Sequence, residues 1–147
     1  MATRSRIGIE LKDGSVLSVY HHHDGYPEWL GRILNTHYNT RQQVIELIDG
    51  GDMSSCWTDS IQYSEEGRTD EYDYYAPDYY SRRGEDCPPS LDRNLTEYLA
   101  DGEEYAYIFT RNNEWVCWNR HQFDFDEDGI TQKQPEIVEI PSGALAV

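Results

Sequence analysis

Hydrophobic and polar positions alternate over two short segments near the start of the chain. Residues 6–11 and 15–22 both have the period of two that is typical of a β-strand. The turn between them ends in Gly14, which suits the left-handed position of a three-residue hairpin loop. This loop places Ile7 opposite Val19, so the sequence predicts a hairpin with one apolar face.

Between residues 27 and 49 the hydrophobic positions recur every three or four residues instead. Pro27 suits the first position of a helix, and the leucines and isoleucines of residues 30–34 predict an apolar stripe that packs on the hairpin. Thr40 and Gln43 fit a capping box at the start of a second short helix. Glycine after residue 49 is typical of the end of that helix.

Neither period persists over residues 52–89, where proline, glycine, serine and charged residues dominate. A segment of this length is too long for an ordinary connection between two elements. We therefore predict that residues 52–89 form a long, acidic, tyrosine-rich insertion or loop within the domain.

Regular patterns return in the last third of the chain. Residues 95–99 predict a short helix, and residues 105–109 and 115–118 predict a second hairpin. Both faces of this hairpin carry apolar side chains, so we expect it inside a sheet. Residues 137–140 are expected to form an edge strand, and residues 141–147 a frayed tail.

These elements predict a single α+β domain over residues 1–147. The expected architecture has two layers: an antiparallel sheet of four to five strands, built from two hairpins, and short helices packed on one face of it. A chain of 147 residues can bury a core of useful size, and 13% aromatic residues argue for a folded chain.

The net charge of −16 is unevenly distributed along the chain. Residues 1–58 carry 7 acidic and 5 basic residues, whereas residues 59–147 carry 21 acidic and 7 basic residues. Such a field repels nucleic acids and anionic lipids and attracts basic surfaces. The alternative interpretation is a charged surface that only keeps the protein soluble.

The segment with the strongest functional signal is residues 70–80, which holds four acids and five tyrosines. Spaced carboxylates can imitate the charges of a phosphate backbone, and tyrosines add rigid contact area. A solvated loop whose tyrosines cover the core is the alternative. The predicted partner-binding residues are Asp70, Glu71, Asp73, Tyr74, Tyr75, Asp78, Tyr79 and Tyr80.

Residues 124–129 match the first six positions of an EF-hand calcium loop, with Asp124, Asp126 and Asp128 as potential ligands. The twelfth position requires a bidentate glutamate and is Pro135 here. No helical pattern flanks the segment. An acidic turn is therefore the favoured interpretation, and no metal site is expected.

Histidines 21–23 suggest a second metal site, because imidazole is a common metal ligand. Adjacent residues of a strand point to opposite faces, so at most His21 and His23 can converge. Histidines beside a turn are the favoured alternative.

A hypothesised pocket for a small ligand or nucleotide signal lies between the first helix and the sheet. Its lining residues would be Asp24, Tyr26, Trp29 and His37.

The three cysteines are odd in number and widely spaced, which indicates reduced thiols in a cytosolic protein. Cys56 and His121 could pair for nucleophilic catalysis, but no local group activates the thiol and no known catalytic glycine motif is present. We therefore expect neither enzymatic activity nor a cofactor, with a metal-assisted enzyme as the remaining alternative. Residues 1–6 show no hydrophobic signal segment, and no apolar run reaches the roughly 18 residues that span a bilayer.

Four segments resemble a family of small, functionally undefined proteins of bacteriophages and plasmids. They are residues 22–34 (HHDGYPEWLGRIL) continuing to His37-Tyr38, residues 47–55 (LIDGGDMSS), residues 102–107 (GEEYAY) and residues 114–115. The family pattern often has a tryptophan at the position of His23, which argues against a metal site there. The resemblance implies a mobile-element accessory protein in a host bacterial cytoplasm, and it transfers no catalytic residue.

Charge and implied setting together favour a non-enzymatic inhibitor. The expected partner is a host defence or nucleic-acid-processing protein whose basic surface is occluded, as by a DNA or RNA mimic of the anti-restriction or anti-CRISPR kind. Direct binding of nucleic acid or membrane is not expected. The alternative is a sponge-like protein that captures a small ligand or nucleotide signal.

Overall fold

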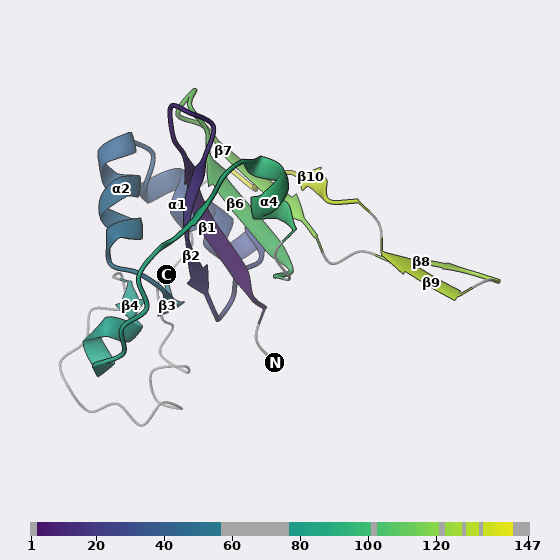
Figure 1. The fold of residues 1–147 in the computed structure, drawn as a ribbon, viewed down its shortest axis with the longest axis horizontal. Coiled ribbons are helices and arrows are strands. Elements are labelled where there is room, and N and C mark those ends of the chain that lie inside the picture. Colours follow the sequence, from purple (N-terminus) through teal and green to yellow (C-terminus); the bar gives the residue numbers. More distant parts are fainter. Residues whose placement is uncertain are drawn as a thin grey trace.

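The computed structural model describes residues 3–56, 77–100, 103–120, 123–127, 129–132 and 134–142 (Figure 1). Its strands are β1 (Ser5–Glu10), β2 (Val16–His21), β3 (Met53–Ser55), β4 (Asp78–Tyr79), β5 (Ser90–Asp92), β6 (Tyr105–Phe109), β7 (Trp115–Asn119), β8 (Phe123–Asp126), β9 (Gly129–Gln132) and β10 (Glu136–Val138). The helical elements are a π-helical turn η1 (Pro27–Gly31), α1 (Arg32–His37), α2 (Arg41–Asp49), a 3-10 turn η2 (Tyr80–Arg83) and α4 (Leu95–Leu99).

The described strands form one open sheet of eight strands and one separate two-stranded sheet. The order in the large sheet is β10-β7-β6-β1-β2-β3-β4, with β5 also paired to β2. The α+β class is thus confirmed, whereas the predicted number of four to five strands is wrong. The extra strands β3, β4 and β5 are only two or three residues long, which is too short to show a period in the sequence.

The first hairpin has the predicted register. Ile7 lies opposite Val19, and Ile9 lies opposite Leu17. Gly14 takes the expected left-handed conformation with φ of 86°. The second hairpin, β6–β7, is also confirmed and lies inside the sheet between β1 and β10.

The sheet is mixed, so the prediction of an antiparallel sheet is wrong in two places. β1 runs parallel to β6, with Ser5 opposite Tyr105, and β2 runs parallel to β3 through the pair His21 and Met53. Between β2 and β3 the chain passes through η1, α1 and α2, which make the crossover of that parallel pair.

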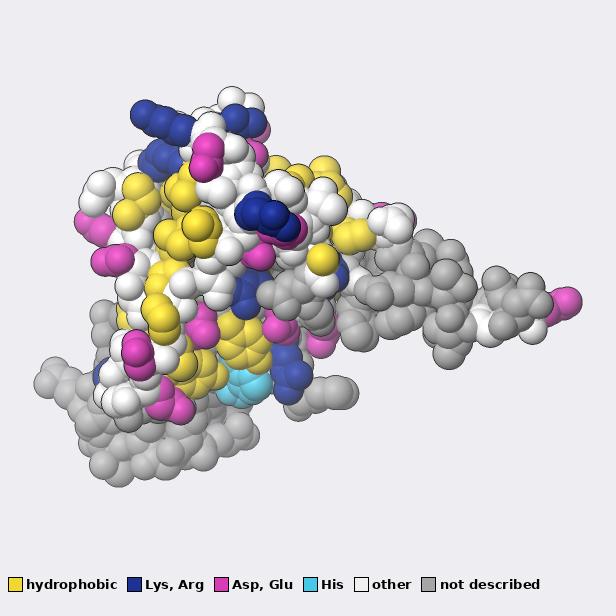
Figure 2. All heavy atoms as spheres, in the orientation of Figure 1, with side chains coloured by type: hydrophobic (Ala, Val, Ile, Leu, Met, Phe, Trp, Pro, Cys, Tyr) yellow, Lys and Arg dark blue, Asp and Glu magenta, His cyan; other side chains and the backbone are white. Residues whose placement is uncertain are grey.

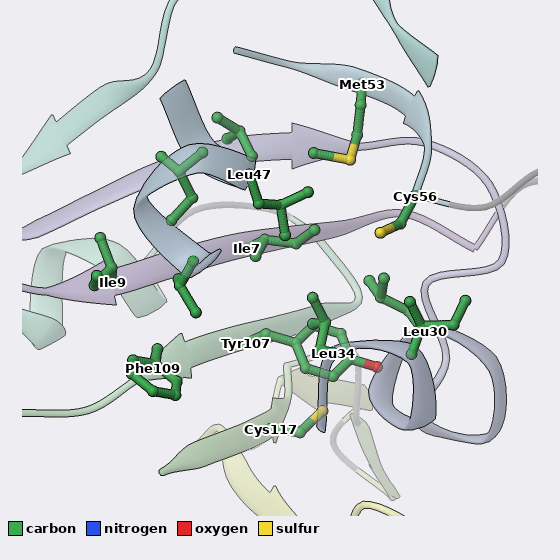
Figure 3. Close-up of a cluster of buried hydrophobic side chains, with 14 residues drawn as sticks. Ile7, Ile9, Leu30, Leu34, Leu47, Met53, Cys56, Tyr107, Phe109 and Cys117 are labelled. Atoms are coloured by element: carbon green, nitrogen blue, oxygen red, sulfur yellow. The ribbon is translucent and has the colours of Figure 1, made fainter. Parts of the chain in front are cut away.

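The larger core lies between the sheet and the helices α1 and α2. Figure 3 shows Ile7 and Ile9 of β1 and Tyr107 and Phe109 of β6 gathered beneath Leu34 and other helical side chains. All these side chains have exposed fractions of 0 to 2%. The capping box of Thr40 and Gln43 is present at the start of α2, as predicted.

The helix α4 packs on the opposite face of the sheet, which corrects the prediction that helices cover one face. Its buried residue Tyr98 joins Val16, Ala106 and Ile108 in a second, smaller core. Gly8 of β1 allows this contact, because a Cβ there would lie 3.0 Å from the Tyr98 ring. The Tyr98 hydroxyl donates to the Tyr107 carbonyl oxygen at 2.6 Å and fixes the helix to β6. The sequence does not predict on which face of the sheet α4 packs, because the three apolar residues of this short helix, Leu95, Tyr98 and Leu99, could pack on either face.

The predicted insertion at residues 52–89 is described at both of its ends. Residues 52–56 contribute β3, and residues 77–89 contribute β4 and η2, so a short strand at each end joins the large sheet. Of the predicted tail, residues 143–147 lie outside the described residues. Within the described part of the chain, every helix is too short or too polar to cross a membrane.

Candidate functional site

The histidines at the end of β2 have different environments. His21 is fully buried, and its Nε2 accepts a hydrogen bond from the main-chain N–H of Cys56 at 2.8 Å. The proton of the neutral ring therefore sits on Nδ1, which faces the hydroxyl of Ser5 at 3.3 Å. Burial, followed by the charges of His23 and His22, lowers the pKa of His21 to about 3. His21 is thus a neutral structural link between β2, β1 and the residue after β3.

His22 and His23 lie nearer the surface, beside Tyr20. The Tyr20 hydroxyl and His22 Nδ1 share a hydrogen bond of 2.5 Å, and the two imidazoles meet edge to face with ring centroids 4.4 Å apart. Asp52 accepts from the main-chain N–H of Tyr20 at 2.8 Å. Figure 2 shows histidine side chains exposed at the surface of this view. Partial burial lowers the pKa of His22, which favours a neutral ring that can donate or accept a hydrogen bond.

The described residues contain no group of three histidine, cysteine or acidic side chains arranged to hold a metal ion. His21 uses its Nε2 for the Cys56 main chain, so it does not converge with His23 on a common site. The metal hypothesis for residues 21–23 therefore has no geometric support within this part of the chain.

The four residues of the hypothesised ligand pocket have different environments in the described part of the chain. Asp24 occupies a left-handed turn with φ of 58°, and Tyr26 directly precedes the turn η1. Trp29 packs against the larger core, with its Nε1 buried and unpartnered among the described residues. His37 is exposed at the far end of α1.

His37 lines a separate open hollow of about 340 Å³. The hollow lies between the end of α1, the helix α2 and the strand β4. Its other lining residues are Tyr38, Gln43, Glu46, Leu47, Pro77 and Tyr79.

The predicted partner-binding segment is described only from residue 77 onward, so Asp70, Glu71, Asp73, Tyr74 and Tyr75 lie outside the described residues. The other three members, Asp78, Tyr79 and Tyr80, lie in or beside the short strand β4.

Asp78 and Tyr79 make contacts that stabilise the fold. Asp78 is fully buried and forms an ion pair of 3.3 Å with Arg82, so its carboxylate is not a surface charge. The Tyr79 ring packs on Gly50, and its hydroxyl donates to the Leu47 carbonyl oxygen at 2.6 Å. Burial raises the pKa of Tyr79, so this hydroxyl stays protonated as a donor. Tyr80 is partly buried.

Residues 123–126 and 129–132 form the paired strands β8 and β9 of a β-hairpin. Asp124 and Asp126 belong to β8 and pair in register with Thr131 and Gly129. An extended, paired backbone cannot wind around a cation as an EF-hand loop does. Asp128 lies outside the described residues. The hairpin projects from the main sheet as an arm (Figure 1), and residues 123–132 contain four acids and no base.

A second open hollow, of about 490 Å³, lies at the base of this arm. Its lining residues are Thr96, Leu99, Ala100, Trp118, Arg120, Gln134 and Pro135. Sequence reasoning missed this hollow, because α4, β7 and the segment before β10 are distant in the chain.

Two polar groups at this hollow are buried. Trp118 Nε1 has no hydrogen-bond partner among the described residues. Arg120 donates to the carbonyl oxygens of Leu99 and Glu103, the latter at 3.0 Å, and so joins the end of α4 to β7. The Arg120 guanidinium is therefore part of the frame of the hollow.

The described part of the chain exposes more acidic than basic residues. Seven arginine side chains donate hydrogen bonds within the protein: Arg6, Arg32, Arg41, Arg82, Arg93, Arg111 and Arg120. Many acids are exposed: Asp13, Glu28, Glu46, Asp49, Glu85, Asp86, Glu114, Glu127, Glu136 and Glu139. Five basic residues are exposed as well, namely Arg4, Lys12, Arg82, Arg93 and Arg111, so exposed acids outnumber exposed bases by ten to five in the described part of the chain.

Cys56 was the sequence candidate for a nucleophile. It is fully buried, and this burial raises the pKa of its thiol to about 12. A thiolate is thus strongly disfavoured at neutral pH. Its potential partner His121 lies outside the described residues.

Comparisons with known proteins leave the resemblance to phage and plasmid proteins as a prediction. No family model matches the chain, and no curated protein or solved structure is significantly similar to it.

Proposed function

We propose that this chain is a non-enzymatic acidic binding protein that occludes a basic surface of another protein. The observation that carries this proposal is the excess of exposed acids, since the described part of the chain exposes ten acidic and five basic residues. With a net charge of −16, the protein attracts cationic surfaces over a distance of roughly one Debye length, about 8 Å at physiological salt.

Two acidic segments are the best candidates for the contact. The arm β8–β9 extends away from the sheet and carries acids at positions 124, 126, 127 and 128. The sequence of residues 70–80 supplies further carboxylates and tyrosines. Basic surfaces of proteins commonly face nucleic acid, so the proposed partner is a nucleic-acid-processing or defence protein. The host bacterial cytoplasm and the phage or plasmid origin belong to this proposal.

Neutralising the acidic segments should slow the association with such a partner. The variant carries the four substitutions Asp70→Asn, Glu71→Gln, Asp124→Asn and Asp126→Asn. The partner is first captured from bacterial lysate with the wild-type protein. We expect the association rate at low salt to fall about tenfold or more, with little change in the dissociation rate, because long-range attraction acts on encounter. Surface plasmon resonance at several ionic strengths measures both rates, and duplex DNA should compete with the chain.

A control variant with the same net charge separates a defined surface from overall acidity. It neutralises four exposed acids elsewhere, namely Asp13, Glu28, Glu46 and Asp49. Its association rate should stay much closer to that of the wild type. Equal slowing by both variants would mean that the acidity acts only as a general charge, and unchanged binding by both would show that it only solubilises the protein.

A second candidate function, the capture of a small ligand or nucleotide signal, is favoured by the hollow of about 340 Å³ beside His37. If this function is correct, a nucleotide should raise the melting temperature of the wild type and should do so less in Tyr38→Ala. Thermal-shift measurements with a panel of nucleotides at millimolar concentration test this. An unmoved melting temperature throughout the panel would exclude this function for nucleotides and leave the acidic binding protein as the supported proposal.

A further inference from the structure

The strand β10 leaves an apolar side chain exposed at the edge of the large sheet. Ile137 has an exposed fraction of 63%, although its neighbour Val138 packs against the larger core. In the register of the β7–β10 pair, Ile137 lies opposite Trp118, and opposed residues share one face of a sheet. Ile137 and Trp118 therefore form an apolar surface on the face that α4 covers in part.

This surface is continuous with the hollow at the base of the arm. Trp118 lines that hollow together with Leu99 and Pro135, and Pro135 directly precedes β10. The buried Trp118 Nε1 has no acceptor within the described part of the chain. An unsatisfied buried donor is unfavourable, so this side of the hollow is destabilised in the free protein.

The outer side of β10 has no partner strand among the described residues, because β10 is the first strand in the order of the sheet. Exposed edges of this kind accept a further strand by main-chain hydrogen bonds, while pockets for alternate side chains provide specificity. The edge Ile137–Val138 and the hollow beside Trp118 together supply both parts of such a site.

The charge around the edge indicates which strand would be accepted. Glu136 and Glu139 are both exposed and flank the pair Ile137–Val138. Two copies of β10 placed side by side would bring these carboxylates together, and each copy carries a net charge of −16. Like charges at a strand pair are destabilising, whereas lysine or arginine side chains opposite the glutamates are favourable.

We propose that the β10 edge accepts an extended, basic segment of a partner protein as an additional strand, and that one of its apolar side chains enters the hollow beside Trp118. The basic character of the segment rests on the proposed function, whereas the strand addition rests on Ile137, Trp118 and the open edge. The two parts can therefore be tested separately.

The test uses two capped peptides of about eight residues, an ordinary strand length, one alternating lysine with valine and one alternating threonine with valine. We expect both peptides to bind and the lysine peptide to bind more tightly. The variant Ile137→Thr should weaken the binding of both peptides by about tenfold, which corresponds to about 1.4 kcal/mol. Threonine keeps the β-branched shape but removes apolar area. The matched control is Ile45→Thr, because Ile45 is also an exposed isoleucine, at 46%, but lies on α2. Titration by nuclear magnetic resonance measures the affinities.

The same titration reports where the peptide lies. In the wild type, the indole N–H resonance of Trp118 should shift, and the amides of Ile137 and Val138 should gain protection against hydrogen exchange. Equal weakening by Ile137→Thr and Ile45→Thr, or protection confined to other strands, would overturn the strand addition. Self-association of the free protein that Ile137→Thr abolishes would also overturn it, because a second copy would then occupy the edge. If both peptides bind equally, the edge site stands and the basic partner of the proposed function fails.

Discussion

Replacing Leu34 with alanine should lower the free energy of unfolding by about 2–5 kcal/mol. Leu34 is completely buried in α1 and packs between the helices and the strands β1 and β6 (Figure 3). Its removal takes apolar area out of the core and leaves a cavity that the surrounding sheet cannot fill without moving. A domain of this size has a total stability of about 5–15 kcal/mol, so the variant would be close to unfolding.

Urea unfolding of the wild type and the variant measures this effect, and the neighbouring Asn35→Ala is the control. Asn35 belongs to the same helix but is exposed, so its replacement should change stability by no more than about 0.5 kcal/mol. A similarly small effect of Leu34→Ala would show that α1 does not contribute to the core in solution.

The second large effect concerns His21 and pH. The His21 pKa is about 3 in the folded protein, compared with 6.5 for the unfolded chain, so the unfolded state binds the proton more readily. The stabilisation by the neutral ring is therefore fully present above pH 6.5. It decreases as the pH falls from 6.5 towards 3, by about 1.4 kcal/mol for each pH unit.

The variant His21→Gln isolates this contribution. Glutamine offers an oxygen that can accept from the Cys56 main chain, but it does not titrate. The difference in unfolding free energy between wild type and variant should shrink steadily below pH 6.5, because all other titrating groups are common to both proteins. Chemical denaturation at half-unit intervals from pH 7 to pH 4 provides the data. A constant difference over this range would mean that His21 is solvated or charged in the folded protein.

The sequence correctly predicted the helices and the hairpin that depend on residues close together in the chain. Pro27 and Thr40 mark the starts of their helices as expected, because a fixed φ angle and a capping hydroxyl act within one turn. The pairing of Ile7 with Val19 followed from loop length and alternation alone. Such elements are stabilised by their neighbours in the chain, so the sequence contains the necessary information within a few residues.

The errors concern contacts between distant segments. Nothing near Ser5 indicates that Tyr105 will lie beside it in parallel, because such a pair requires a crossover of the whole intervening chain. The sequence of residues 124–129 favours an acidic turn, although Phe123, Asp124, Phe125 and Asp126 alternate apolar and acidic side chains. The same period of two is that of the strand β8.

For the candidate surfaces too, the features that depend on composition could be predicted from the sequence, and the features that depend on distant contacts could not. The acidity that supports the proposed function could be predicted from composition. The burial of Asp78 by the fold could not, because it depends on the position of β4 beside β3 and on the ion pair with Arg82. The hollow beside Trp118 also could not be predicted, since three segments separated in the chain form its walls.

The parallel pair of β1 and β6 also affects the synthesis of the protein. The two strands are about 100 residues apart, and a ribosome adds roughly 5–20 residues per second. The first hairpin must therefore wait about 5–20 s with one side of β1 exposed, before its neighbour leaves the ribosome. During that interval Ile7 and Ile9 lack the β6 side chains Tyr107 and Phe109, which share their core. The nascent chain is thus exposed to aggregation early in translation.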